Sequence, residues 1–334
     1  MRTAIYGAGA LGTALGAYVT KAGYQIDLIN HNAAHVRALQ NNGARIIGKV
    51  DMSVPVTALT PDEMTGEYDV VILMTKQLDN KKVVEFLSGY LSPGGIICTC
   101  QNGLPELSVS EVIGEARTYG CAVLWGATLR DPGVSEMTSD PYALTCLLGG
   151  YNNLSGENFD YLVKLFWTMG EVVIEENLIG ARWSKLLINS AFSGLSTVLG
   201  CTFGEVCDNK KSRVYAQLLI KESIDICAFA NIKIKPVQGK DIVKLFDYRN
   251  PFKKWFSRML IPIAMKQHRN IRASMLYDIK RGKKCEIEAI NGVVAKFGRK
   301  FGVPTPVNDK VIEIIGRIEA GELRPAFSNL ALMS

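Results

Sequence analysis

The sequence predicts an α/β protein in which an N-terminal, doubly wound and mostly parallel sheet is followed by a C-terminal all-helical domain. Short apolar runs alternate with helical segments up to about residue 178, and helical periodicity alone continues from there to residue 334. A glycine-rich turn at residues 7–12 stands directly behind the first apolar run, residues 3–6. We therefore expect a Rossmann domain over residues 1–178 and a helical domain over residues 179–334.

The glycine-rich turn has the form Gly-x-Gly-x-x-Gly. It consists of Gly7, Ala8, Gly9, Ala10, Leu11 and Gly12. In such a turn the first glycine allows a tight bend, the second lets the backbone approach a pyrophosphate, and the third lets a helix pack closely on its strand. The free N–H groups at the start of that helix attract the anion. Because a strand precedes the turn and a helical segment follows it, we expect dinucleotide binding; a glycine turn without a ligand is the alternative.

The predicted strands of the first domain are short apolar runs, several of them without a polar interruption. Continuous apolarity is typical of strands that are covered on both faces, as in a parallel doubly wound sheet. The expected strands are residues 2–7, 25–30, 44–50, 69–75, 95–100 and 118–125, and later runs near 133–137, 143–149 and 172–176 extend the same sheet. Helices such as 10–22 and 78–90 fill the gaps.

The second domain shows the period of an α-helix throughout. Long helices are expected near residues 179–199, 210–231, 251–269 and 286–301, with a last one near 307–320. Prolines mark their starts and breaks, at Pro236, Pro251, Pro304 and Pro306.

Composition is that of a globular protein, with 48% hydrophobic and 21% charged residues. No apolar run reaches the roughly 18 residues that span a bilayer, and no secretory signal pattern is present, so we expect a cytoplasmic protein without membrane contact. The eight cysteines form no Cys-x-x-Cys pair and stand among apolar neighbours, and there are only three histidines. We expect buried thiols and no metal site.

Charge is distributed unevenly between the two predicted domains. Residues 1–178 carry 11 basic and 19 acidic side chains, whereas residues 179–334 carry 27 and 13. Opposite net charges suggest two domains that face a shared anionic ligand. A nucleic-acid surface and a solvated basic helix face are the alternatives; because no known nucleic-acid motif accompanies the basic segment, we expect no nucleic-acid partner.

The end of the second predicted strand bears on the choice of cofactor. An acidic residue there binds the ribose diol of NAD, but this strand ends in Asn30, His31 and Asn32, and Asp27 lies inside it. A missing acid favours the 2′-phosphate of NADP, which His31 or Arg37 would help to hold. The usual arginine is also missing at the tip, so NADP is favoured and NAD stays open.

Polar residues also follow two further strands, where open α/β sheets bind ligands. Lys76 is a candidate for a cofactor phosphate or the substrate, and Asn102 for a hydrogen bond near the nicotinamide. In each case an ordinary polar helix start is the alternative.

In the helical domain, Lys185 and Asn189 are four residues apart and share one helix face. A lysine among so many apolar neighbours either extends to solvent or lines a pocket, where burial would lower its pKa and make it a general acid. Ser274 and Asp278 form a second pair with the same spacing. Glu286 precedes an apolar helical segment, and the pattern alone favours a helix N-terminal carboxylate over a catalytic group.

Taken together, these motifs resemble the ketopantoate reductase (2-dehydropantoate 2-reductase) family in the same order and almost from end to end. The matching positions are residues 7–12, Lys76, Gln101-Asn102-Gly103, Lys185 with Asn189, Ser274-Met275-Leu276 with Asp278, Glu286-Ile287-Glu288 before Ile290-Asn291-Gly292, and residues 302–308. The resemblance implies reduction of a 2-oxo acid by NADPH, as in pantothenate and coenzyme A biosynthesis, and makes a homodimer plausible.

The resemblance also implies roles for single residues. Lys185 matches the lysine that donates a proton to the developing alkoxide, and Glu286 matches a residue that contacts the cofactor close to the reacting centre. Asn189 and Ser274 match positions that orient the substrate, Ser274 toward its carboxylate. The remaining matches line the cofactor site: Lys76, Asn102 and Ala127.

Two substrate positions depart from the family pattern. Ser193, followed by Gly194, stands where a second asparagine followed by proline is usual, and Phe203 replaces another substrate-contacting asparagine. Three hypotheses follow: a ketopantoate reductase proper, a related NAD(P)-dependent reductase of another 2-oxo acid, and a non-catalytic dinucleotide sensor. The presence of both Lys185 and Glu286 argues against the sensor hypothesis, because a sensor does not need a proton donor.

Overall fold

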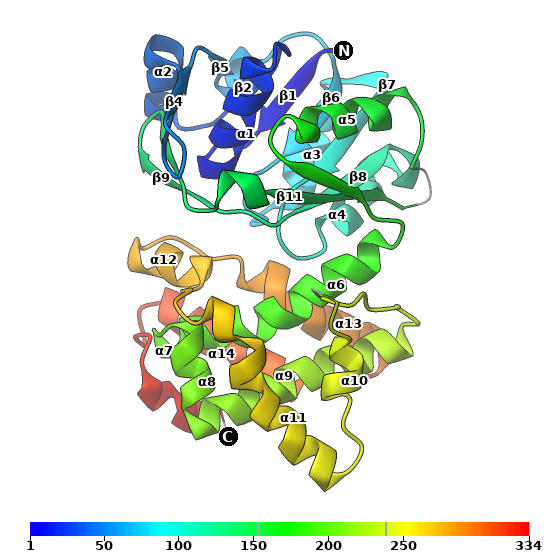
Figure 1. The fold of residues 1–334 in the computed structure, drawn as a ribbon, viewed down its shortest axis with the longest axis vertical. Helices are drawn as coiled ribbons and strands as arrows, with labels where there is room; N and C mark the ends of the chain where they lie inside the picture. Colours follow the sequence, from blue (N-terminus) through cyan, green and yellow to red (C-terminus); the bar gives the residue numbers. More distant parts are fainter. Residues whose placement is uncertain (152–153, 238, 334) are drawn as a thin grey trace. The chain divides into compact units, whose positions relative to one another are not determined.

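The computed structural model describes residues 1–151, 154–237 and 239–333, and the chain divides into two compact units (Figure 1). The first unit comprises Met1–Gln101 and Pro105–Leu178, and the second comprises Asn102–Leu104 and Ile179–Ser334.

The first unit is built on an eight-stranded sheet with the strand order β12-β11-β8-β7-β6-β1-β2-β5. The six strands from β5 to β8 run parallel, whereas β11 is antiparallel to β8 and parallel to β12. This arrangement confirms the predicted mostly parallel sheet. The strands are β1 (Thr3–Tyr6), β2 (Asp27–Ile29), β5 (Thr57–Leu59), β6 (Tyr68–Leu73), β7 (Leu91–Thr99), β8 (Thr118–Val123), β11 (Thr145–Gly150) and β12 (Glu171–Ile174).

Four further strands form a second, smaller sheet with the order β4-β3-β10-β9. They are β3 (Ala44–Gly48), β4 (Met52–Val54), β9 (Ala127–Asp131) and β10 (Val134–Met137). The prediction that runs 44–50 and 133–137 belong to the main sheet was wrong, because β3 and β10 pair with each other. In β3 only Ala44 and Ile46 are buried, which is the alternation of a sheet covered on one face.

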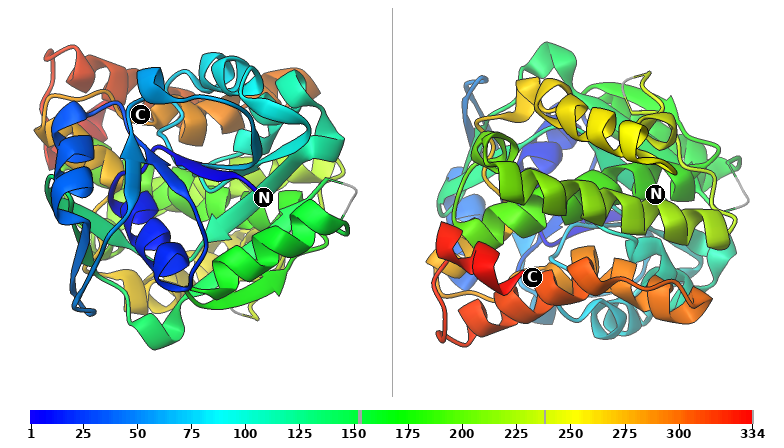
Figure 2. Two further views of the ribbon diagram at one scale, coloured as in Figure 1. Left: turned by 90° about the horizontal axis from the view of Figure 1, so that it is seen from above. Right: turned by 90° about the horizontal axis from the view of Figure 1, so that it is seen from below.

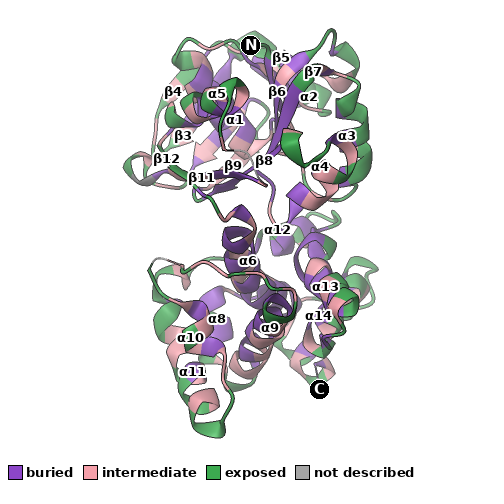
Figure 3. Cartoon of the chain, turned by 90° about the vertical axis from the view of Figure 1, so that its right-hand side faces the viewer, coloured by how far each residue is buried: buried purple, intermediate pink, exposed green. Residues whose placement is uncertain are grey.

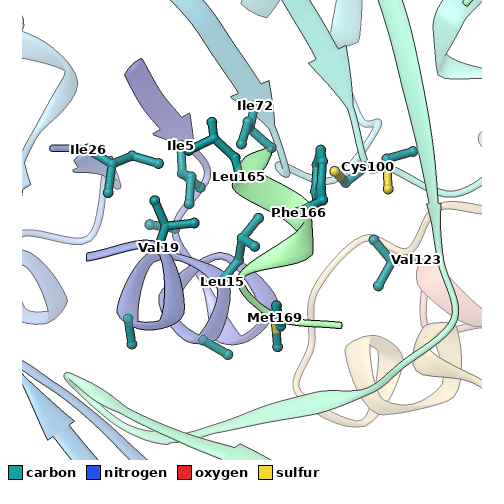
Figure 4. Close-up of a cluster of buried hydrophobic side chains, with 14 of the residues drawn as sticks. Ile5, Leu15, Val19, Ile26, Ile72, Cys100, Val123, Leu165, Phe166 and Met169 are labelled. Carbon is teal, nitrogen blue, oxygen red and sulfur yellow. The ribbon is translucent and has the colours of Figure 1, made fainter. Parts of the chain in front are cut away.

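Helices cover both faces of the main sheet, as predicted. Leu15 of α1 and Leu165 and Phe166 of α5 pack with Ile5 and Ile72 on one face (Figure 4). On the other face of the sheet, side chains of α3 and α4 pack against the strand residues that point the opposite way, among them Val71 and Leu73. The helices of this unit are α1 (Ala10–Lys21), α2 (Ala33–Asn42), α3 (Asn80–Ser88), α4 (Pro105–Ile113) and α5 (Glu157–Trp167), with short 3₁₀ turns at Pro61–Glu63, Glu115–Arg117 and Pro141–Ala143.

The second unit is helical, as predicted, and α9 forms its centre. Seen from below, α9 lies between α11 on one side and α13 and α14 on the other (Figure 2). Buried residues are frequent on α6 and α9 (Figure 3), and every residue of α7 is buried. The helices are α6 (Leu178–Ile188), α7 (Gly194–Leu199), α8 (Phe203–Asp208), α9 (Lys210–Phe229), α10 (Ile242–Phe246), α11 (Pro251–Ala264), α12 (Ser274–Lys280), α13 (Val293–Phe301) and α14 (Pro306–Glu319), with 3₁₀ turns at Lys266–His268 and Phe327–Leu332.

Two of the predicted long helices are interrupted by π-helical segments. The first, Asn189–Ser193, joins α6 to α7, and the second, Glu288–Gly292, leads into α13. A π-helical turn contains one extra residue and is frequent at functional sites. Both segments fall within the motifs that resemble the reductase family.

Two further properties of the described chain bear on its class. All eight cysteines are buried, as expected. Within the part of the chain that the structure describes, every helix is too short or too polar to cross a lipid bilayer.

Candidate active site

The first candidate region is the carboxyl edge of the main sheet, at the point where the strand order reverses. From β1 the chain proceeds to β2 on one side, whereas β6 lies on the other side of β1 and leads to β7. Ligands of doubly wound sheets bind in the crevice at such a switch point. The glycine-rich turn lies there, because the backbone N–H groups of Gly7 and Ala8 both donate to the carbonyl of Ile29, each at 2.9 Å.

Two glycines of this turn are required for different reasons. Gly7 has φ +93°, and a Cβ there would lie 2.5 Å from the backbone nitrogen of Thr75. Gly9 has φ −81°, and a Cβ there would lie 3.9 Å from the carbonyl oxygen of Gly7, its nearest contact outside the adjoining chain. The space beside Gly9 is therefore open, although a glycine stands there. Both observations are explained if ligand phosphates approach this backbone closely. The residues of the turn therefore fit a dinucleotide.

The close packing of α1 on the sheet depends on two glycines rather than one. A Cβ on Gly12 would lie 3.0 Å from Cγ2 of Ile5, and a Cβ on Gly16 would overlap the side chain of Leu28. From the sequence, only Gly12 was predicted to have this role. The spacing of four residues between the two glycines was the available signal, since it places both on one face of the helix.

A buried histidine that the sequence analysis did not single out holds the glycine-rich turn in place. Nε2 of His35, on α2, lies 2.9 Å from the carbonyl oxygen of Ala8, while its Nδ1 accepts from the backbone N–H of Gly133 at 3.0 Å. This pattern assigns the proton of the neutral ring to Nε2. Thr13 adds a hydrogen bond from its hydroxyl to the same carbonyl of Ala8, at 3.2 Å. His35 therefore links the turn to the smaller sheet.

Protonation of His35 is expected to weaken the first unit in acid. Burial lowers the pKa of His35, although its hydrogen bond to Ala8 opposes this shift. A lowered folded-state pKa gives a stability contribution that is present above about pH 6.5 and is lost as the pH falls through the folded-state pKa. The protonated ring would turn a second donor toward the N–H group of Gly133.

We expect His35→Gln to remove this part of the acid dependence and to lower the free energy of unfolding at neutral pH by about 1–3 kcal/mol. The measurement is the thermal midpoint by circular dichroism at several values between about pH 7 and pH 5. His31→Gln is the matched control, since His31 is exposed and its replacement should leave the wild-type profile intact. An unchanged profile in His35→Gln would contradict the assignment.

The tip of β2 carries no carboxylate that could reach a ribose. Asp27 lies at the opposite end of β2 and accepts a hydrogen bond from the Tyr68 hydroxyl at 2.8 Å. At the tip, Asn32 caps α2 by accepting from the N–H of His35 at 3.2 Å. The side chains of His31 and Arg37 are exposed next to this cap.

Hydrogen bonds of the Gln101 side chain connect the loops that follow β6 and β7. Its side-chain amide donates to the carbonyl of Thr75 at 2.9 Å and to Oδ1 of Asn80 at 2.7 Å. Lys76, next to Thr75, is exposed, and Asn102 directly follows Gln101 and is half-buried. The sequence motif around residue 101 thus has a structural role in addition to any contact with a ligand.

Ala127 belongs to the smaller sheet, at the start of β9, where it pairs with Met137 of β10. This sheet also contacts the glycine-rich turn, because the hydroxyl of Ser135 on β10 donates to the carbonyl of Ala10 at 2.8 Å. The contact between Ser135 and Ala10 joins segments that are 125 residues apart, so no local sequence pattern predicts it.

In the second unit, the candidate residues gather around the two π-helical segments. Lys185 lies on α6 and is half-buried, while Asn189 and Ser193 are the first and last residues of the first segment. Glu286 is buried and stands two residues before the second segment.

A buried amide network joins the two segments. The side-chain amide of Asn291 donates to the carbonyl of Ser190 at 3.0 Å and to Oδ1 of Asn308 at 2.9 Å. Asn308 in turn donates from its side chain to Glu222 at 2.7 Å, and the same carboxylate accepts from the backbone N–H of Val307 at 2.8 Å. Burial raises the pKa of Glu222, whereas these donors lower it. Sequence reasoning missed Glu222, which lies 86 residues from Asn308.

Of the remaining substrate candidates, Phe203 contacts the first π-helical segment, and the residue before Ser274 contacts α7, which follows that segment. The ring of Phe203 is buried and lies 5.8 Å from the ring of Phe192, which is in that segment. Ser274 is exposed at the start of α12, and the preceding Ala273 donates its N–H to Oγ of Ser196 at 3.2 Å. Phe203 therefore packs into the helical core beside the substrate candidates.

Two family models match consecutive parts of the chain. The one described as "Ketopantoate reductase PanE/ApbA" matches residues 3–146, and the one described as "Ketopantoate reductase PanE/ApbA C terminal" matches residues 177–319. The chain belongs to the ketopantoate reductase family. This confirms the resemblance inferred from the motifs and makes the chain an oxidoreductase by family.

Similar proteins support the assignment over nearly the full length. A 2-dehydropantoate 2-reductase of Pyrococcus horikoshii is 27% identical over 313 residues, covering 92% of this chain and 94% of that protein. One from Aquifex aeolicus is 26% identical over 331 residues, covering 97% and 99%.

Solved structures with the same fold include a PanE/ApbA family ketopantoate reductase from Ralstonia eutropha JMP134, with TM-score 0.81, 21% identity and coverage of 96% and 99%. A D-mandelate dehydrogenase with NADH and anilino(oxo)acetate has TM-score 0.79, 21% identity and the same coverage.

Within this member of the ketopantoate reductase family, each unit thus collects its own set of candidates. The first unit places the glycine-rich turn and the neighbouring strand tips at one edge of the sheet. The second unit places Lys185, Asn189, Ser193 and Glu286 around two π-helical segments that Asn291 joins.

Proposed function

We propose that this protein reduces the ketone of a 2-oxo acid with NADPH, and that ketopantoate (2-dehydropantoate) is the substrate. The first unit, residues 1–178, serves as the dinucleotide-binding domain, and residues 179–334 supply the groups that bind and protonate the substrate. One observation carries the proposal: the buried Asn291 amide joins the π-helical segment that continues the helix of Lys185 to the π-helical segment after Glu286. The names of the curated relatives agree with this reaction.

The nicotinamide cofactor supplies a hydride when it is bound. Hydride addition at the ketone carbon of the substrate would move the electron pair of the C=O π bond to the oxygen. Lys185 then gives a proton from Nζ to that oxygen, which yields the 2-hydroxy acid, and solvent restores the proton of the lysine. Because an ammonium also stabilises negative charge on the oxygen, one side chain provides both acid and electrostatic catalysis. Asn189 and Ser274 orient the substrate, and Glu286 contacts the cofactor near the reacting centre.

The cofactor proposed is NADP, held by residues 7–12 with Lys76, Asn102 and Ala127. His31, just after the tip of β2, and Arg37, on the following helix α2, are exposed and support a 2′-phosphate. Asp27 is engaged by Tyr68 at the other end of β2. A free ribose diol would lack its usual carboxylate partner there. NAD remains the second candidate.

A second candidate function is reduction of a different 2-oxo acid. It is favoured by Ser193 and Phe203, which replace expected asparagines, and by the contact of Phe203 with Phe192. An aromatic ring at this place removes hydrogen-bonding capacity and suits a substrate with less polar substituents. The D-mandelate dehydrogenase of similar fold, which was solved with NADH and anilino(oxo)acetate, agrees with this alternative.

Initial rates of NADPH oxidation with ketopantoate, repeated with NADH and with branched, unbranched and aromatic 2-oxo acids, test the proposal. We expect the highest kcat/KM with ketopantoate and NADPH. Faster turnover of another acid would replace the proposed substrate and make Ser193 and Phe203 specificity residues. No turnover of any acid, with intact NADPH binding, would overturn the enzymatic function in favour of a sensor. Cytoplasmic location and a homodimer remain predictions.

A further inference from the structure

The start of α14 is capped by a side chain from another helix. Glu222 of α9 accepts hydrogen bonds from the backbone N–H groups of Val307 at 2.8 Å and of Asn308 at 3.1 Å, which are the second and third residues of α14. The hydroxyl of Thr305, at the usual capping position, donates instead to Asp309 at 3.1 Å. A carboxylate at the start of a helix satisfies N–H groups that have no partner within the helix. Glu222 therefore joins the start of α14 to α9.

From Glu222 a line of side-chain hydrogen bonds leads to the first π-helical segment. Asn308 donates from Nδ2 to Glu222 at 2.7 Å and accepts on Oδ1 from Nδ2 of Asn291 at 2.9 Å. Asn291 also donates to the carbonyl of Ser190 at 3.0 Å. The extra residue of a π-helical turn interrupts the regular ladder of backbone hydrogen bonds, and Asn291 donates to the backbone at this interruption. We call the side chains of Glu222, Asn308 and Asn291 the Glu222 network.

Gly194, directly after the π-helical segment, gives the Asn291 amide its space. A Cβ on Gly194 would lie 3.0 Å from Oδ1 and 3.2 Å from Nδ2 of Asn291. Both distances are shorter than an ordinary van der Waals contact, so a side chain at this position would displace the amide. Glycine is a weaker helix former than alanine, and the close approach of Asn291 explains why a helical position carries it.

The segment held by the Glu222 network carries two of the proposed substrate residues but not the proposed acid. Asn189 and Ser193 are its first and last residues, whereas Lys185 lies about one turn earlier, on α6. A shift of the segment would therefore displace groups that orient the substrate and leave Lys185 on its helix.

We propose that Glu222 and Asn308 are positioning residues, which act through Asn291 on the π-helical segment and so set the affinity for the substrate. The inference rests on the proposed function, since it takes Asn189 and Ser193 as substrate-binding residues. Misplacement of a binding group by about 1 Å can cost on the order of 100-fold in rate. Because the proposed acid stands outside the segment, loss of the network should raise KM more than it lowers kcat.

Exchange of donor and acceptor between two residues tests the network. Glu222→Gln keeps the shape of the side chain but turns an amide NH₂ group toward donors of α14. We expect a KM for the 2-oxo acid about 10- to 100-fold higher, with kcat within about threefold and an unchanged dissociation constant of NADPH. Asn308→Asp alone places a second carboxylate beside Glu222 and should have the same effect. In Glu222→Gln/Asn308→Asp the amide again faces a carboxylate, so KM should partly recover.

Gln217→Ala is the matched control. Gln217 is another buried side chain of α9, but it bonds to α11, accepting from Nε of Arg258 at 3.1 Å and donating to the hydroxyl of Ser257. Its loss should lower the thermal midpoint and leave KM unchanged. An equal rise of KM in this control would overturn the proposal. A lower thermal midpoint in Glu222→Gln with wild-type KM would also overturn it, because the network would then only stabilise the fold.

Hydrogen–deuterium exchange separates this inference from the proposed function, since it requires no turnover. We expect the backbone amides of residues 189–193 to exchange at least about tenfold faster in Glu222→Gln than in the wild type, with unchanged exchange in β1. Unchanged exchange at residues 189–193 would overturn the link between Glu222 and the segment. A wild type that reduces no 2-oxo acid would overturn the proposed function and the substrate role of the segment, whereas faster exchange in the variant would still support the link.

Discussion

Lys185→Met is expected to lower kcat by about 10²- to 10⁴-fold while the dissociation constant of NADPH stays within about twofold of the wild type. Methionine keeps the length and the apolar stem of the side chain but removes the proton and the charge. The proton that must reach the substrate oxygen then comes from water, and the developing negative charge loses its partner. Steady-state kinetics and NADPH fluorescence titration measure the two quantities separately.

Two further variants sharpen this prediction. Lys185→Arg keeps a positive charge but holds its proton too tightly to act as an acid, so we expect partial recovery of KM and little recovery of kcat. Lys310→Met is the matched control, since Lys310 is a half-buried lysine of α14 that pairs with Glu313 at 2.7 Å. It should retain wild-type kcat. A Lys185→Met enzyme with kcat within about threefold of the wild type would remove Lys185 from the reaction.

The parts of the fold that were predictable from the sequence are those with a local cause. The glycine-rich turn depends on residues within one strand, one turn and one helix, and most of strand β6 follows from the uninterrupted apolar run at residues 70–73. Strand partners are not local. The run that became β3 has the composition of any short strand, and only its pairing with β10, about ninety residues later, places it in the smaller sheet.

The same argument separates the predicted from the missed site residues. Lys185, Asn189 and Glu286 belong to motifs that a sequence can display. His35 acts on the glycine-rich turn only because Gly133, 98 residues away, fixes its ring. The π-helical segments were also missed, because one extra residue in a turn hardly changes the apolar period over so short a stretch. The π-helical segments are recognised only from their backbone hydrogen bonds, which join residues five apart instead of four.

Gly9→Ala is expected to lower the affinity for NADPH by at least about tenfold, and to have a smaller effect on the stability of the fold. In the absence of a ligand the added methyl group meets nothing closer than the Gly7 carbonyl, 3.9 Å away. The methyl group instead occupies the space that the phosphates need, and the loss of binding follows from contact with the ligand.

The control for this experiment must carry backbone strain without the ligand contact. Gly23 has φ +91° and open space around its hypothetical Cβ, so Gly23→Ala should lower stability by about 1–2 kcal/mol and leave NADPH affinity unchanged. Isothermal titration calorimetry and thermal unfolding on both variants separate the two effects. If Gly9→Ala bound NADPH as tightly as the wild type, the pyrophosphate would have to lie elsewhere along the sheet edge. Equal losses of affinity in both variants would instead attribute the effect to the fold.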